Sequence, residues 1–149
     1  MTSTYLGYYS LIFGFILSII LLFYSIFCLK YNNKNISQNI YSILFLQFFT
    51  VVISFISLVY SFVISDFSNE TVYNNSHTTK PIFYKISGTW GNHEGSLLLW
   101  ICIMVFFSYL FLIFNKKAPA KFNLLTLITQ NILILGFLFF LLINSNPFS

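Results

Sequence analysis

The 149-residue sequence is 58% apolar and only 7% charged, with a formal net charge of +4. Soluble domains carry about 25% charged residues, and a soluble fold of this length has too small an interior for twenty Phe. The composition therefore excludes a soluble globular domain and indicates an integral membrane protein, whose surplus apolar surface lipid can solvate. The seven Lys lie between apolar runs rather than on one face, so no nucleic-acid partner is expected.

Four long apolar runs occur along the chain, at about residues 5–29, 40–64, 95–114 and 122–143. Each approaches or exceeds the ~20 residues that a helix needs to cross a bilayer, and none has an interior Lys, Asp or Glu. Backbone exposed to lipid must satisfy its own hydrogen bonds, which favours helices over open strands. We predict an all-α integral membrane fold, in which residues 1–149 form a single domain of four transmembrane helices with one long outward-facing loop at 65–94.

The first run differs from a cleavable signal peptide. No basic segment precedes it, and its apolar stretch exceeds the usual 7–15 residues. We therefore expect it to remain in the mature protein as a transmembrane helix.

The distribution of Lys between the loops predicts the orientation. The short connections at 30–39 and 115–121 hold five Lys, and the loop at 65–94 holds two; the five are Lys30, Lys34, Lys116, Lys117 and Lys121. Lys is enriched in short loops on the cytoplasmic side of membranes. The short connections should therefore face the cytoplasm or matrix, and both termini and the loop at 65–94 should face the periplasm or intermembrane space.

Few polar side chains lie within the predicted helices. Gln47 and Gln130 fall at similar depth, roughly 10–12 Å from the inner end, where they can hydrogen-bond between helices. Asn131 should face elsewhere, and a polar path through the membrane is the alternative interpretation of the two Gln. Cys28 and Cys102 lie at depths too different for a disulfide and are predicted to be buried free thiols.

The end of the long loop carries the most information. Residues 85–100 read KISGTWGNHEGSLLLW, in which three Gly permit a close approach or a positive φ. Asn92 or Ser96 can cap the helix that follows, and Glu94 suits the positive end of its dipole. Trp90 should lie at the membrane rim and Trp100 one to two turns further in.

His93 and Glu94 form the only His–acid pair in the chain, and three interpretations remain open for it. The pair can ligate haem or a metal, transfer protons, or fix the loop to the helix. No second ligand has a fitting spacing, so no metal site is predicted. His77 lies in a polar stretch and is expected to be merely exposed.

Residues 88–100 closely resemble the CcmF family, the large membrane subunit of the system I cytochrome c haem lyase. Residues 60–68, 81–86 and 144–148 resemble the same family in order and spacing. The resemblance implies the N-terminal part of such a subunit. The family's tryptophan-rich haem-holding segment and haem-ligating histidines come later in the family chain than anything present here, so we expect a fragment from a split gene.

The resemblance also implies a function and a location. The family belongs to a complex that attaches haem b to the CxxCH cysteines of apocytochrome c. This chain would supply scaffold, with no catalytic residue and no haem ligand of its own, and Trp90, Asn92, His93, Glu94 and Trp100 would lie near the haem. The implied partners are the remaining CcmF fragments, a haem chaperone, thiol-handling maturation subunits and apocytochrome c. The expected location is the mitochondrial inner membrane or a bacterial inner membrane.

Two other classes of function remain as alternatives. The chain can be a structural subunit of a larger inner-membrane respiratory assembly. A transporter subunit fits less well, because transport of protons or cations usually requires ionisable residues within the membrane, and the predicted helices contain none.

Overall fold

The computed structural model describes residues 2–31 and 38–149, and none of these residues lies in a strand. Its helices are, in chain order, α1 (Thr2–Lys30), α2 (Gln38–Val63), α3 (Glu70–Asn75), α4 (Ile82–Gly88), α5 (His93–Phe114) and α6 (Ala120–Asn144). The helices α1, α2, α5 and α6 are each long and apolar enough to cross a membrane. They confirm the four predicted transmembrane helices, whose limits agree to within three residues.

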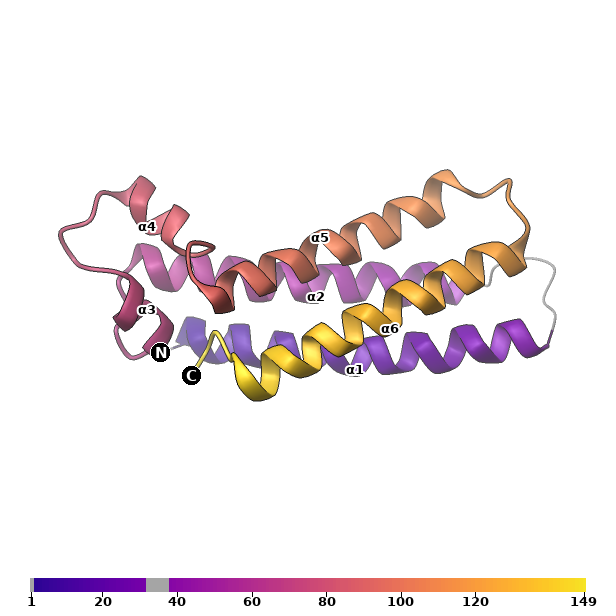
Figure 1. Cartoon of the computed structure of the whole chain (residues 1–149), viewed down its shortest axis with the longest axis horizontal. Coiled ribbons are helices and arrows are strands. Elements are labelled where there is room, and N and C mark those ends of the chain that lie inside the picture. Colours follow the sequence, from indigo (N-terminus) through magenta and orange to yellow (C-terminus); the bar gives the residue numbers. More distant parts are fainter. Residues whose placement is uncertain (1, 32–37) are drawn as a thin grey trace.

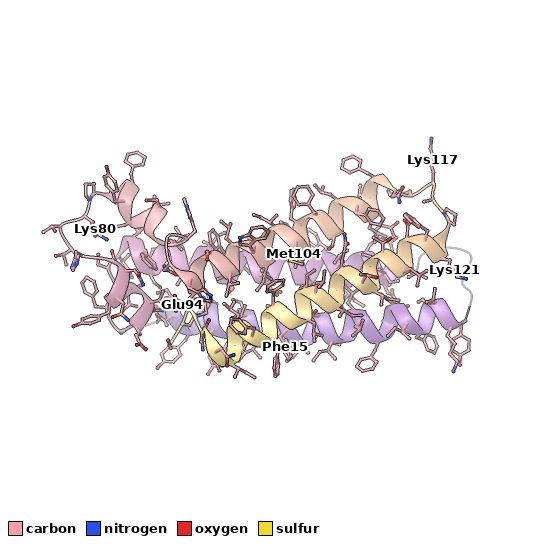
Figure 2. All side chains as sticks on the ribbon, in the orientation of Figure 1. Phe15, Lys80, Glu94, Met104, Lys117 and Lys121 are labelled. Atoms are coloured by element: carbon pink, nitrogen blue, oxygen red, sulfur yellow. The ribbon has the colours of Figure 1, made fainter. Side chains whose placement is uncertain are left out.

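The four long helices run side by side along the long axis of the molecule (Figure 1). The helix α1 packs against α2 and α6, while α5 packs against α2 and α6. Both termini lie at the same end as α3 and α4, which we call the loop end (Figure 1). Lys80 and Glu94 are at the loop end, and Lys117 and Lys121 are at the opposite end (Figure 2).

This arrangement matches the predicted separation between the long loop and the Lys-rich connection at 115–121. The compartment that each end faces stays a prediction. Lys34, which also entered the count of Lys, lies outside the described residues.

Small residues bring α1 and α2 into close contact. The Ser54 hydroxyl donates to the carbonyl oxygen of Gly7 at 3.0 Å, and the Ser61 hydroxyl donates to the Ser3 hydroxyl at 3.1 Å. A Cβ atom on Gly14 would lie 3.1 Å from the Val51 side chain, so the helices already touch there. Lipid gives no hydrophobic drive for helices to associate, and close packing and interhelical hydrogen bonds hold them together instead.

A buried polar cluster joins three of the four long helices. The Asn131 amide nitrogen on α6 donates to the Ser18 carbonyl at 2.7 Å, and its amide oxygen accepts from the Ser18 hydroxyl at 2.9 Å. The same oxygen accepts from the Gln47 amide nitrogen on α2 at 3.4 Å. We call Ser18, Gln47 and Asn131 the polar cluster.

The expected pairing of Gln47 with Gln130 is therefore wrong. Gln130 is only half buried, and its amide oxygen has no partner among the described residues. One residue along a helix turns a side chain by about 100°, which points Asn131 rather than Gln130 at the interior. The prediction that Cys28 and Cys102 are buried free thiols is confirmed.

The segment at 65–94 contains two short helices that the sequence analysis did not predict. The end of α2 forms a Schellman motif, in which the Asp66 amide donates to the Ser61 carbonyl at 3.0 Å and Ser65 has a φ of 56°. The Lys85 ammonium of α4 donates to the Ser65 hydroxyl at 2.6 Å. These contacts hold α4 against the loop end of α2.

The residues after α6 hold α3 in place. The Asn69 side chain caps α3 by accepting from the Val72 amide at 3.1 Å, and its nitrogen donates to the Pro147 carbonyl at 2.8 Å. The Phe148 ring lies directly over Gly7, where a Cβ atom would overlap it. The segment at 65–94 is thus fixed to the bundle rather than free of it.

Candidate functional site: the junction of α4 and α5

The junction between α4 and α5 is held by a single side chain. Asn92 precedes α5 with an extended backbone, and its amide oxygen accepts from the Gly95 amide at 2.7 Å. Its amide nitrogen donates to the Gly88 carbonyl at 2.9 Å and to the Thr89 carbonyl at 3.2 Å. Asn92 therefore caps the start of α5 and the end of α4 together, satisfying backbone groups that helix ends leave unpaired.

Gly95 makes this junction sterically possible. A Cβ atom at this position would overlap the backbone carbonyl oxygen of Thr89. Among the described glycines none has a positive φ, so the close-approach interpretation is confirmed for Gly95 and the positive-φ interpretation is wrong. Gly91 is different, because its nearest neighbours would lie at ordinary contact distances of 3.5 Å and more from a Cβ atom.

The predicted choice between Asn92 and Ser96 as the helix cap is settled by these contacts. Asn92 is the cap, whereas the Ser96 hydroxyl donates back to the His93 carbonyl at 2.9 Å. Glu94 lies in the first turn of α5, as expected, near the positive end of the helix dipole.

His93 connects the start of α5 to the end of α6. Its Nδ1 atom lies 3.4 Å from the Ser145 hydroxyl, and its ring meets the Phe140 ring edge-on at 6.3 Å between centroids. The imidazole itself is exposed. This geometry favours the interpretation that His93 fixes the loop end to the bundle, and it leaves the outer part of the ring accessible. His77 is exposed as well, as expected.

The two Trp residues are both on the surface. Trp90 is 42% exposed and Trp100 is 64% exposed. His93 and Trp100 are seven residues apart on one helix and share a face, roughly 10 Å apart along its axis. Of the five residues predicted to lie near haem, Asn92 is thus taken up in the junction, while Trp90, His93 and Trp100 present accessible rings and Glu94 is half buried.

Thr89 is a member of the junction that the sequence analysis missed. Its residue is fully buried, and its carbonyl receives Asn92 and lies against Gly95. Its hydroxyl has no partner within the described part of the chain. Thr89 lies six residues before Gly95 in the sequence. Their contact could not be predicted from this spacing without knowing that the backbone turns between α4 and α5.

The junction holds no ready set of metal or catalytic ligands. No group of three or more His, Cys, Asp or Glu side chains comes together anywhere in residues 2–31 and 38–149. The junction is an edge of the bundle that the Asn92 caps hold in shape. It carries the imidazole of His93, the carboxylate of Glu94 and the indole rings of Trp90 and Trp100. Such an edge can border a large planar group.

Comparison with known proteins connects this geometry to a family. The chain is 46% identical to the cytochrome c-type biogenesis protein CycK of Rhizobium meliloti over 102 residues, which cover 68% of this chain and 15% of that protein. It is 34% identical to the cytochrome c-type biogenesis protein CcmF of Haemophilus influenzae over 144 residues, or 97% of this chain and 22% of that protein. No family model matches the sequence.

The fold matches a solved structure as well. The structure of cytochrome c haem lyase CcmF superimposes with a TM-score of 0.91 at 21% identity, covering all of this chain and 25% of that one. The chain therefore has the fold of a part of that protein. It spans no more than about a quarter of the length of any of these three proteins.

Proposed function

This chain is homologous to the CcmF-type cytochrome c-type biogenesis proteins, and from that premise we propose that it is the N-terminal scaffold of a membrane haem lyase. The observation that carries the proposal is the 46% identity to CycK over 102 residues, together with a superposition over the whole chain. Because the matched residues cover only 15% to 22% of these relatives, the rest of the lyase would come from further polypeptide.

The reaction of the complex is the attachment of haem b to apocytochrome c. Each Cys thiol of a CxxCH motif adds across a haem vinyl group, so one C–S bond forms and no atom leaves. The cofactor supplies this chemistry, and protein positions the two reactants. Cys28 and Cys102 of this chain take no part, because both are buried and neither belongs to a CxxCH motif.

The α4–α5 junction is the part of this chain that borders the reaction site. Trp90, His93 and Trp100 present exposed rings on this side, Glu94 is half buried, and Asn92 bonds to the backbone on both sides of the junction. Haem is not ligated by this chain, and its axial ligands come from the remaining CcmF-type polypeptide. The loop end faces the compartment in which cytochrome c matures, a mitochondrial intermembrane space or a bacterial periplasm.

The chain works within an assembly. Its partners are the remaining CcmF fragments of a split gene, a haem chaperone, thiol-handling maturation subunits and apocytochrome c. Its four apolar helices are long enough to cross a membrane, and together with the CcmF-type relatives they support a multi-pass protein of the inner membrane.

A native pull-down tests the proposal. The tagged chain, purified in mild detergent from its own membranes, should bring down a polypeptide carrying the rest of the CcmF sequence, together with haem in stoichiometric amount. Recovery of respiratory-complex subunits in place of that polypeptide would instead favour a structural role in a respiratory assembly. A preparation with neither that polypeptide nor haem contradicts the proposal.

The role of the junction has its own test. The double variant His93→Ala with Glu94→Ala should lower the yield of covalent cytochrome c haem, while the chain remains in the membrane in normal amount. His77→Ala, which removes an exposed imidazole elsewhere in the segment at 65–94, is the matched control and should leave the yield unchanged. Normal maturation in the double variant would remove the junction from the reaction site.

A further inference from the structure

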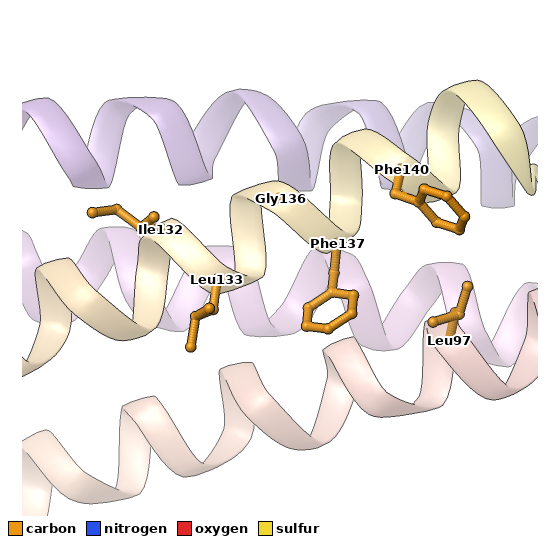
Figure 3. A pocket seen from close by; sticks show the side chains of 6 residues that line it. All are labelled: Leu97, Ile132, Leu133, Gly136, Phe137 and Phe140. Atoms are coloured by element: carbon orange, nitrogen blue, oxygen red, sulfur yellow. The ribbon is translucent and has the colours of Figure 1, made fainter.

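An apolar groove of about 440 Å³ lies between α5 and α6 on the outside of the bundle. Six residues line it: Leu97, Ile132, Leu133, Gly136, Phe137 and Phe140. Figure 3 shows Leu133 and Phe137 of α6 directed toward α5, and Leu97 of α5 directed toward α6. None of the six side chains carries a polar or charged group, so whatever fills the groove is apolar.

No contact within the described part of the chain explains why position 136, in this groove, is a glycine. A Cβ atom at this position would meet nothing within 4 Å, whereas the Cβ atoms of the other glycines would all have at least one neighbour within 4 Å. Glycine in the middle of a helix is less favourable than alanine. Nothing that this chain packs against Gly136 therefore requires the missing side chain.

A missing side chain on a transmembrane helix is useful when another helix approaches closely. Small residues let two helix backbones come together within a membrane, where packing is the main attraction. A lipid tail, in contrast, bends around whatever side chains it meets and gains little from one absent methyl group. The groove and its glycine therefore point to a helix as the occupant rather than to lipid.

The similar proteins indicate where such a helix would come from. This chain matches 14% to 22% of the length of the similar biogenesis proteins, so most of such a protein lies outside the matched part. We propose that the α5–α6 groove seats a transmembrane helix from the remaining part of the CcmF-type protein, which approaches α6 closely at Gly136. This inference rests on the proposed function.

The groove also lies next to the candidate site. Phe140 lines the groove and meets the His93 ring edge-on, and Leu97 is one turn below His93 on α5. A helix seated in the groove would end beside the α4–α5 junction. It would bring the next part of the CcmF-type protein to the edge that carries His93 and Glu94.

Photo-crosslinking in native membranes tests the inference. A photoreactive phenylalanine analogue replaces Phe137 in the groove or, as a matched control, Phe23 on the exposed side of α1. The analogue at position 137 should crosslink to a peptide whose sequence aligns with the CcmF-type proteins outside the part matched here, and the analogue at position 23 should not. Adding Gly136→Leu, which fills the groove, should abolish the crosslink, whereas Ile20→Phe on α1 should leave it unchanged.

The outcomes separate this inference from the proposed function. Crosslinking of position 137 to lipid alone, while the pull-down still recovers the rest of the CcmF sequence, would overturn the inference and leave the function standing. A crosslink to an unrelated membrane protein, with no CcmF-type polypeptide recovered, would overturn both. A crosslink that survives Gly136→Leu would contradict the close approach at Gly136.

Discussion

Two regions of this molecule satisfy their polar groups in opposite ways, one through local hydrogen bonds and the other through hydrogen bonds between helices. At the α4–α5 junction one side chain, Asn92, satisfies backbone groups that are at most four residues away in sequence. In the polar cluster Asn131 satisfies groups that lie 113 and 84 residues away, on two other helices. The junction therefore fixes local shape, and the cluster fixes which helices pack together and in which register.

This contrast predicts different sensitivities. A change at the junction disturbs backbone that has no room to move, whereas a change in the polar cluster removes interhelical hydrogen bonds that average only about 0.6 kcal/mol within membranes. Tight local packing should thus dominate over polar pairing between helices.

The largest effect is expected at Gly95. Gly95→Ala places a methyl group into the Thr89 carbonyl, and overpacking of this kind should cost about 3 kcal/mol or more. The measurement is the fraction of folded protein in mild detergent titrated with a denaturing detergent. Gly91→Ala is the control, since its Cβ atom would meet only ordinary contacts; equal losses for the two variants would show that the close approach does not matter.

Asn92 should show the next largest effect. Asn92→Ala removes both caps and should cost about 2 kcal/mol, because a lost N-cap alone costs about 1 kcal/mol and two carbonyls also lose their donor. Asn92→Asp keeps the oxygen that accepts from the Gly95 amide but loses the donors, so its loss in the same titration should be about half as large. Wild-type stability in Asn92→Ala would contradict the claim that the Asn92 hydrogen bonds hold the junction together.

The polar cluster should be less sensitive. Asn131→Leu leaves the Ser18 hydroxyl and the Gln47 amide without their acceptor and should cost about 1 kcal/mol. Gln130→Leu, one residue earlier, should cost nothing, because its amide oxygen has no partner among the described residues. A larger loss of stability for Gln130→Leu than for Asn131→Leu would show that Gln130, and not Asn131, makes the hydrogen bonds between the helices.

Gly136 belongs to neither region and gives the smallest effect. In the isolated chain Gly136→Ala should raise stability by about 0.5–1 kcal/mol, since alanine favours a helix and open space surrounds the position. The unfolding titration of the purified chain measures it. A loss of stability would mean that α6 already packs against something at Gly136 within this chain.

The same contrast explains what could be predicted from the sequence. The four transmembrane helices follow from uninterrupted apolar runs, and the local sequence limited the cap of α5 to Asn92 or Ser96, of which the structure shows Asn92. The pairing of Asn131 with Ser18 depends on the rotation of α6 against α1, which no local pattern fixes. An error of one residue in that rotation is what made Gln130 look like the partner.

The helices α3 and α4 were missed for a related reason. Each is short, and each is held by contacts from distant residues, the Pro147 carbonyl for the cap of α3 and the Ser65 hydroxyl for Lys85 of α4. The place of His93 against Phe140 and Ser145 is likewise a tertiary contact. The resemblance to CcmF drew attention to the segment at 88–100, and the fold shows that Asn92, Gly95 and Thr89 are in direct contact within it.

The most direct test of the account is the amount of covalently bound haem in c-type cytochromes when this chain is depleted and then restored. Haem-stained gels of the membranes should lose the c-type bands on depletion and regain them with the wild-type chain but not with Gly95→Ala. Undiminished c-type cytochromes in membranes that lack the chain would contradict the account.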